Sequence, residues 1–200
     1  MKIIDLSRPH DFSRACRAFR DELDRRFGRP DLVVGIATGG LRTVESMGYS
    51  PAKVIAVKRQ RASTRLKSYS RIGAVFRSMP IFISDMARMV EAFLREQRFI
   101  LSGKRLEQRP VKVIDGAAWL DLQPNSILII DDAVDSGATF VDVVGFLKDA
   151  FPDAMFVTAA ICQTFRNPAY KVDYIMYKRT LLRCPWAMDA KYRSCFGKGR

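Results

Sequence analysis

The sequence feature that most constrains the fold is the stretch I-L-I-I-D-D-A-V-D-S-G-A-T at residues 127–139. Its four consecutive apolar residues are typical of a parallel strand that is covered on both faces, because both rows of side chains are then buried. The small residues that follow predict a turn, and residues 140–151 predict a helix. A buried strand that leads through a tight turn into a helix indicates an α/β domain.

The rest of the chain continues this alternation of strands and helices. Apolar runs of strand length predict strands at residues 2–6, 31–37, 53–57, 111–114, 154–162 and 172–177. Apolar residues at helical spacing predict helices at residues 12–27, 41–47 and 84–99. We therefore predict a single α/β domain over residues 1–200, with an open, mainly parallel sheet flanked by helices.

Basic residues are abundant and mark two of the segments that we distinguish within this domain. The segments are an N-terminal strand and helix, a flexible basic loop, an extra helical segment and a basic tail, at residues 1–29, 58–82, 83–110 and 191–200. The chain has 34 Lys and Arg against 21 Asp and Glu, a net charge of +13. Such an excess attracts polyanions, so both a nucleic acid and a phosphate-rich substrate are candidate partners.

The composition argues against several classes of protein. The four cysteines are widely scattered without a C-x-x-C pair, and His10 is the only histidine, which argues against a zinc site or a disulfide framework. No apolar run approaches the roughly 20 residues that a membrane span needs. The N-terminus carries charge too early for a signal peptide, so we expect a cytoplasmic protein without membrane contact.

Two neighbouring acids, Asp131 and Asp132, follow the central apolar run. In an open parallel sheet, ligands bind beyond the carboxyl ends of the strands, which is where these acids are expected. The turn that follows precedes a helix, and backbone N–H groups at a helix N-terminus bind phosphate. Ser136 and Thr139 add hydroxyl groups, and Gly137 permits a positive φ or a close backbone approach. Carboxylates beside a phosphate predict a phosphorylated sugar, whose hydroxyls or bound magnesium they would hold.

Residues 127–139 resemble the phosphoribosyl-pyrophosphate signature of type I phosphoribosyltransferases. That signature has four apolar residues, two acids, two apolar residues and a small-residue turn ending in threonine; it usually has a larger aliphatic residue where this chain has Ala133. The stretch V-V-G-I-A-T-G-G-L at residues 33–41 resembles the pyrophosphate loop of the same family, in which paired glycines let backbone N–H groups approach pyrophosphate. The family often has a basic residue where this chain has Thr38.

The resemblance covers roughly residues 30–190. It implies the type I phosphoribosyltransferase fold, with a small hood and a mobile active-site loop that would begin in the basic stretch at residues 58–71. It also implies transfer of 5-phosphoribosyl from phosphoribosyl pyrophosphate (PRPP) to an acceptor, with release of pyrophosphate through an oxocarbenium-like transition state. Magnesium would neutralise the pyrophosphate as it leaves. We also expect a homodimer.

The resemblance assigns roles to individual residues. Asp131 and Asp132 would hold the ribose hydroxyls and magnesium. The 5′-phosphate would be held by the turn formed by Asp135, Ser136, Gly137, Ala138 and Thr139. Pyrophosphate would be bound at Thr38, Gly39, Gly40, Lys58 and Arg59.

The acceptor is indicated by the third acid of the motif, Asp135. In family members that act on 6-oxopurines, an acid at this position is thought to act on the purine ring nitrogen, so a purine base is favoured. The alternative is that Asp135 merely caps the following helix. The lysine expected to contact the purine 6-oxygen is missing from the run I-C-Q-T-F-R-N-P, and Lys171 and Arg166 are the candidates to replace it in that role.

The C-terminal stretch Y-K-R-T-L-L-R-C-P-W-A-M-D resembles the hood that covers the base in bacterial xanthine–guanine phosphoribosyltransferases, and we assign residues 163–190 to this hood-like segment. By the family spacing the residue that stacks on the base is Leu181, while Trp186 either contacts the base or belongs to the core. The segment at residues 83–110 exceeds what a minimal member needs and could shape an acceptor pocket or a dimer contact.

Two other interpretations remain at the level of the sequence. A regulator with the phosphoribosyltransferase fold would bind PRPP and a nucleic acid, which the charge of +13 favours and the intact acids disfavour. A receiver-like signalling domain also places paired acids at a sheet edge, but the D-S-G-A-T turn and the late position of the motif argue against it. Catalysis by Asp131, Asp132 and Asp135 is the interpretation that we favour.

Overall fold

The computed structural model describes residues 1–50, 54–59, 81–116, 121–187 and 190. The strands are β1 (Lys2–Asp5), β2 (Leu32–Ile36), β3 (Val54–Arg59), β4 (Val111–Asp115), β5 (Ser126–Val134), β6 (Met155–Gln163), β7 (Tyr174–Lys178) and β8 (Thr180–Arg183). The helices are α1 (Pro9–Phe27), α2 (Gly39–Met47), α4 (Ile81–Leu101) and α5 (Ala138–Ala150). Most of the predicted basic loop and tail lies outside the described residues.

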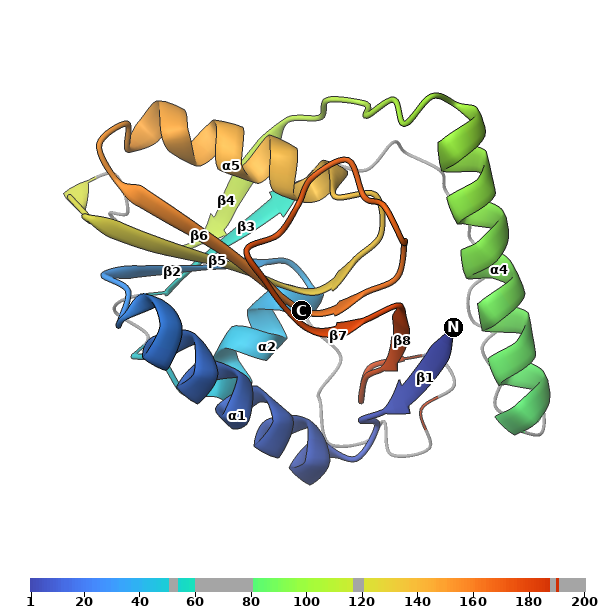
Figure 1. The fold of residues 1–200 in the computed structure, drawn as a ribbon. Helices are drawn as coiled ribbons and strands as arrows, with labels where there is room; N and C mark the ends of the chain where they lie inside the picture. Colours follow the sequence, from blue (N-terminus) through green and yellow to red (C-terminus); the bar gives the residue numbers. More distant parts are fainter. Residues whose placement is uncertain (51–53, 60–80, 117–120, 188–189, 191–200) are drawn as a thin grey trace.

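Six of these strands form one sheet in the order β4-β3-β2-β5-β6-β7. All of its neighbouring pairs are parallel except β3 and β4, which run antiparallel at one edge. Helices α1 and α2 cover one face and α5 covers the other (Figure 1). The predicted α/β fold with an open, mainly parallel sheet is therefore confirmed.

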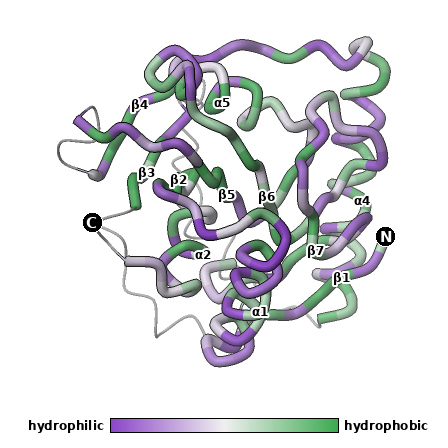
Figure 2. The backbone as a smooth tube through the Cα atoms, turned by 60° about the vertical axis from the view of Figure 1, so that its left-hand side comes forward, coloured by the Kyte–Doolittle hydropathy of each residue, from purple (hydrophilic) through white to green (hydrophobic). Residues whose placement is uncertain are grey.

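Both faces of β5 are buried, which explains its unbroken apolar run. Leu128 and Ile130 pack into the core beneath α1 and α2, while Ile127 and Ile129 pack into the core beneath α5. Figure 2 shows the hydrophobic residues gathered along the central strands. Because each row of side chains meets a helix layer, neither row could be polar without burying unpaired groups.

Strand β5 is longer than the sequence predicted. We expected it to end before the acids, but it continues to Val134, so Asp131 and Asp132 lie within the strand and not beyond it. The reason is the length of β6, which pairs in parallel with β5 as far as Val134. A neighbouring strand supplies backbone partners that local apolar patterning does not reveal.

Two further differences concern the chain ends and the first glycine turn. Strand β8, which the sequence analysis missed, pairs in parallel with β1 to form a separate two-stranded sheet beside the large one. Gly39 and Gly40, expected in a turn, are the first two residues of α2. None of the helices that the structure describes is long and apolar enough to cross a membrane.

Gly40 lies where α2 meets the backbone of β5. A Cβ atom at this position would stand 2.2 Å from the carbonyl oxygen of Ile130 and 2.9 Å from the Cα atom of Asp131. Both neighbours are backbone atoms of a central strand, so they cannot move aside cheaply. The first turn of α2 can therefore approach β5 only because this residue has no side chain.

We predict that Gly40→Ala lowers the free energy of unfolding by about 3 kcal/mol or more, because the added methyl group overlaps the backbone of β5. The matched control is Gly145→Ala in α5, where an added Cβ meets nothing within 4 Å. That substitution should raise stability by about 0.5–1 kcal/mol, as alanine does in a helix interior. Chemical denaturation of both variants checks the prediction, and equal effects would contradict it.

Candidate active site

A pocket of about 410 Å³ opens at the carboxyl ends of β2 and β5. It is lined by residues 36–39, by residues 131–140, and by Arg59 and Trp186. The two strands are neighbours, but the helix after β2 covers one face of the sheet and the helix after β5 covers the other (Figure 1). Such a point, where connections diverge to opposite faces, is where open α/β sheets bind ligands.

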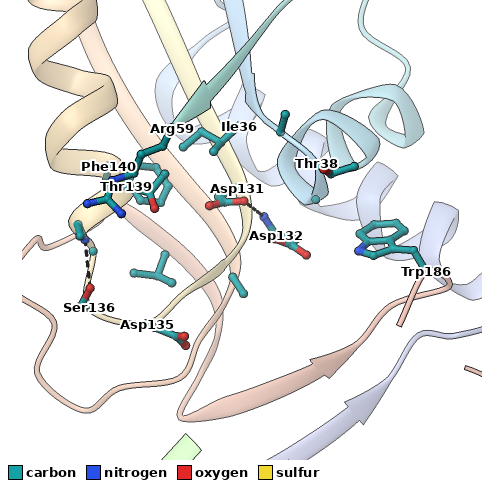
Figure 3. A pocket seen from close by; sticks show the side chains of 16 residues that line it. Ile36, Thr38, Arg59, Asp131, Asp132, Asp135, Ser136, Thr139, Phe140 and Trp186 are labelled. Carbon is teal, nitrogen blue, oxygen red and sulfur yellow. Dashed lines mark hydrogen bonds between the residues drawn. The ribbon is translucent and has the colours of Figure 1, made fainter. Parts of the chain in front are cut away.

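The paired acids lie in the middle of this pocket. Figure 3 shows Asp131 and Asp132 between the turn that leads into α5 on one side and Thr38 and Trp186 on the other. The backbone N–H of Asp132 donates a hydrogen bond of 2.9 Å to Oδ1 of Asp131. Both acids that the sequence marked as ligand-binding candidates therefore line the same pocket.

Burial governs the electrostatics of this pair. Burial raises the pKa of Asp131 well above its usual range, and the neighbouring charge of Asp132 raises it further. Burial also raises the pKa of Asp132, although hydrogen bonds to its carboxylate oppose that shift. The two neighbouring carboxyl groups therefore resist ionisation. A bound cation or a set of hydroxyl donors would stabilise their ionised form.

The turn after β5 is shaped for a close backbone approach. Gly137 has φ of 82°, and a Cβ there would stand 2.7 Å from the Cβ of Tyr170. The Ser136 carbonyl accepts the N–H of Ala169 at 2.9 Å, and Ser136 Oγ accepts the N–H of Ala138 at 3.3 Å. The turn is thereby fixed against residues 169–170, and the N-terminal end of α5 faces the pocket with its positive dipole end.

Asp135 lines the pocket and is held by a residue that the sequence analysis did not identify. Nη1 of Arg95, on α4, donates a hydrogen bond of 2.9 Å to Oδ2 of Asp135. The position that caps α5 is Gly137, not Asp135, so the alternative of Asp135 as the helix cap is wrong. Nothing in the sequence marks Arg95, because its partner lies 40 residues away and the two meet only through the fold.

The predicted pyrophosphate residues separate into three groups. Thr38 and Gly39 line the pocket, whereas Gly40 packs behind it against β5. Arg59 also lines the pocket, with its Nε bonded to Oδ2 of Asp142 on α5. Lys58 is exposed and does not line the pocket, since successive residues of a strand point to opposite faces.

The predicted base-contacting residues also differ in position. Trp186 lines the pocket and at the same time packs against the core, with its ring 4.9 Å from that of Phe12 and edge-on to it. The guanidinium of Arg42 lies 5.1 Å from the centre of the Trp186 ring. Leu181 is buried in β8 opposite Ile3 and does not line the pocket.

The two residues considered as replacements for the missing lysine, Arg166 and Lys171, do not line the pocket. The apolar part of the lining was not predicted from the sequence, because no chemical signal marks it. It comes from Ile36, Ala37, Val134 and Phe140.

The residues in the pocket fit a magnesium ion that takes most of its ligands from substrate oxygens and water. Among the described residues, no group of three or more His, Cys, Asp or Glu is placed to hold a metal by itself. Magnesium bound beside phosphates commonly uses only one or two protein carboxylates and takes its other ligands from water and the substrate. Asp131 and Asp132 supply that number.

We predict that Asp131→Asn stabilises the protein at neutral pH. The pKa of Asp131 is raised in the folded state, so the folded state binds its proton more tightly than the unfolded chain, whose pKa is near 3.8. Ionising this group therefore costs stability as the pH rises from about 4 toward the folded-state pKa. The variant removes that cost and keeps an oxygen that can accept the Asp132 N–H.

The expected gain is about 1 kcal/mol or more at pH 8, or roughly 2–4 °C in Tm, and close to zero at pH 4. Thermal unfolding of the variant and the wild type at both pH values checks this. Asp149→Asn, at an exposed position on α5, is the control and should change Tm little at either pH. A destabilised Asp131→Asn variant at pH 8 would contradict the assignment.

No protein-family model matches the chain, and neither does any curated protein. Solved structures do match. The xanthine-guanine-hypoxanthine phosphoribosyltransferase of Helicobacter pylori has a TM-score of 0.55 at 15% identity, over 88% of this chain and 89% of that one. The purine phosphoribosyltransferase of Pyrococcus horikoshii Ot3 has a TM-score of 0.54 at 15% identity, over 93% and 94%. The chain therefore has the phosphoribosyltransferase fold that its motifs predicted.

Proposed function

We propose that this protein is a magnesium-dependent phosphoribosyltransferase that transfers 5-phosphoribosyl from PRPP to a purine base and releases pyrophosphate. The observation that carries the proposal is the half-buried acid pair beside the glycine turn that leads into α5, in one pocket at the point where the helices diverge to opposite faces of the sheet. Two of the solved structures with this fold, those of Helicobacter pylori and Pyrococcus horikoshii Ot3, are purine phosphoribosyltransferases, which supports the same reaction class.

The 5′-phosphate of PRPP is bound at the turn from Asp135 to Thr139. Backbone N–H groups at the start of α5 and the hydroxyls of Ser136 and Thr139 supply the donors there. The carboxylates of Asp131 and Asp132 hold the ribose hydroxyls. This two-point grip fixes the sugar so that its anomeric carbon faces the remaining volume of the pocket.

Pyrophosphate is bound on the opposite side, near Thr38 and Gly39, where the N-terminal end of α2 carries a positive dipole end. Arg59 borders the same volume, and Lys58 remains a second candidate although its side chain does not line the pocket. A magnesium ion held by Asp131 and Asp132 would neutralise charge on the departing pyrophosphate. The acceptor nitrogen attacks the anomeric carbon as the bond to pyrophosphate breaks, so an oxocarbenium-like transition state forms.

The acceptor base lies against Trp186, with Asp135 directed at a ring nitrogen. An indole ring offers a stacking surface for a purine, and Trp186 is the aromatic residue that borders the pocket from the C-terminal segment. Arg95 holds Asp135 as a carboxylate acceptor for a purine N–H. Leu181 could contact the base only if the β1–β8 sheet shifts, since it is buried here.

The deciding experiment measures pyrophosphate release from PRPP and magnesium with adenine, guanine, hypoxanthine, xanthine, orotate or uracil as acceptor. We expect turnover with a 6-oxopurine, because the family members that act on 6-oxopurines resemble this chain in carrying an acid at the position of Asp135. Turnover with orotate alone would contradict the acceptor assignment but keep the reaction class. If PRPP binds and no base is turned over, the enzyme assignment fails.

The combined Asp131→Asn and Asp132→Asn variant should lose at least about 10³-fold in kcat/KM, since both the ribose grip and the magnesium ligands are removed. Asp149→Asn is the control and should retain wild-type kcat/KM. The double variant should also unfold at a temperature no lower than the wild type, which separates lost chemistry from lost fold. Retained transfer activity would contradict the role of these acids.

A second candidate function is favoured by the net charge of +13. In this alternative the protein is a regulator that binds PRPP in the same pocket and a nucleic acid on its basic surface. Non-specific binding by charge weakens steeply as salt rises, whereas a regulator should retain preference for one sequence or shape. Binding assays over a range of salt concentrations, with and without PRPP, separate the two functions. A cytoplasmic location is compatible with either function and remains part of the proposal.

A further inference from the structure

Helix α4 is turned so that its apolar residues face outward. Met86, Val90 and Phe93 each expose about half of their side chain, at 51%, 51% and 53%. The buried residues of this helix are Ser84, Ala92 and Glu96, which are small or charged. An amphipathic helix normally buries its apolar stripe against its own domain. The reversed orientation leaves a contiguous hydrophobic surface of the kind that marks an interaction site.

Polar contacts on the inner side hold α4 in this orientation. Nη2 of Arg88 donates to the Leu182 carbonyl at 2.7 Å, and Arg183 bonds to Asp85. Glu96 accepts a hydrogen bond of 2.7 Å from Arg179.

Burial raises the pKa of Glu96, but hydrogen bonds from Arg179 and from the backbone N–H of Arg166 outweigh it, so the net shift is downward. Because Glu96 is thereby held as a buried carboxylate in an ion pair, the apolar side of the helix cannot rotate inward without breaking these contacts.

The outward residues follow the spacing of a helix–helix seam. They recur at alternating intervals of three and four residues over five helical turns, which is the heptad pattern of helices that pack along their length. Ile83 and Val90, seven residues apart, are β-branched, and Gln97 follows after seven more residues. The seam consists of Ile83, Met86, Val90, Phe93, Gln97 and Ile100.

The charge of α4 identifies the partner as a second copy of this chain. Three of its six charged residues, Asp85, Arg88 and Glu96, make contacts on the inner side. On the outer side Arg95 pairs with Glu91 and Asp135, and Arg98 is the fourth charge there. The two positive and two negative charges balance, although the whole chain carries +13. Two strongly basic molecules repel each other wherever their charged surfaces meet. A neutral face that is apolar along a heptad seam avoids this repulsion and matches an identical helix, as a two-fold symmetric interface requires. A polyanion would instead seek the basic surface.

We propose that the outward face of α4 is the surface through which two copies of this chain form a homodimer, with the seams of the two helices packed against each other. The proposal does not depend on the catalytic function. It does link the dimer contact to the pocket, since α4 also supplies Arg95, which holds Asp135.

Sedimentation velocity over a roughly hundredfold range of protein concentrations tests the proposal. The wild type should sediment as a dimer. The combined Val90→Glu and Phe93→Glu variant should be a monomer, with the dimer Kd raised by at least about 10³-fold, because each interface would then bury four unpaired carboxylates. Both positions are exposed in the single chain, so the variant should keep its circular dichroism spectrum and its Tm for the monomer.

Arg98→Glu is the matched control, since it changes the net charge by the same amount at an exposed position of α4 outside the seam. It should remain dimeric. A monomeric wild type would overturn the proposal, and so would a dimer that the seam variant retains. Binding of the monomer to phospholipid vesicles through this face would also overturn it, by assigning the face to a membrane surface.

Discussion

The site depends on the contact between the first turn of α2 and the backbone of β5. Gly40 meets the carbonyl of Ile130, and a Cβ at Gly39 would stand 2.2 Å from the carboxyl carbon of Asp132. Two segments that are about 90 residues apart in the sequence are thereby so close that there is no space for a side chain between them. The N-terminal ends of α2 and α5 and the two acids then surround the same volume, which is what allows one pocket to hold a phosphate, a sugar and a second anion.

This arrangement is electrostatically unfavourable in the protein alone. Burial raises the pKa values of Asp131 and Asp132, and the charge of Asp132 raises that of Asp131 further, so the pair weakens the fold at neutral pH. A cation or sugar hydroxyls would relieve that cost, and the free energy that is stored in the pair would then favour ligand binding. Active sites commonly combine lower stability with pre-formed geometry in this way.

The part of the site that could be predicted from the sequence is the part that is contiguous in it. Residues 131–139 form a strand, a turn and a helix start with an interpretable chemistry, and the structure keeps them together. Arg95 could not be predicted, since it reaches Asp135 from a helix that is placed by long-range polar contacts. The pairing of β1 with β8 was missed for the same reason, because the two strands lie at opposite ends of the chain. The sequence predicted α4 well as a helix, but its orientation depends on Glu96 and Arg179 and not on its apolar stripe.

The central claim is that the half-buried acid pair, in its ionised form, holds magnesium and PRPP. The most direct test is isothermal titration of PRPP with magnesium into the protein near neutral pH, in buffers of different ionisation enthalpy, which counts the protons exchanged on binding. Since ligand binding must lower the raised pKa values of Asp131 and Asp132, the account predicts net proton release that the Asp131→Asn and Asp132→Asn variant lacks. Binding with no proton release, or with the same release in the variant, would contradict it.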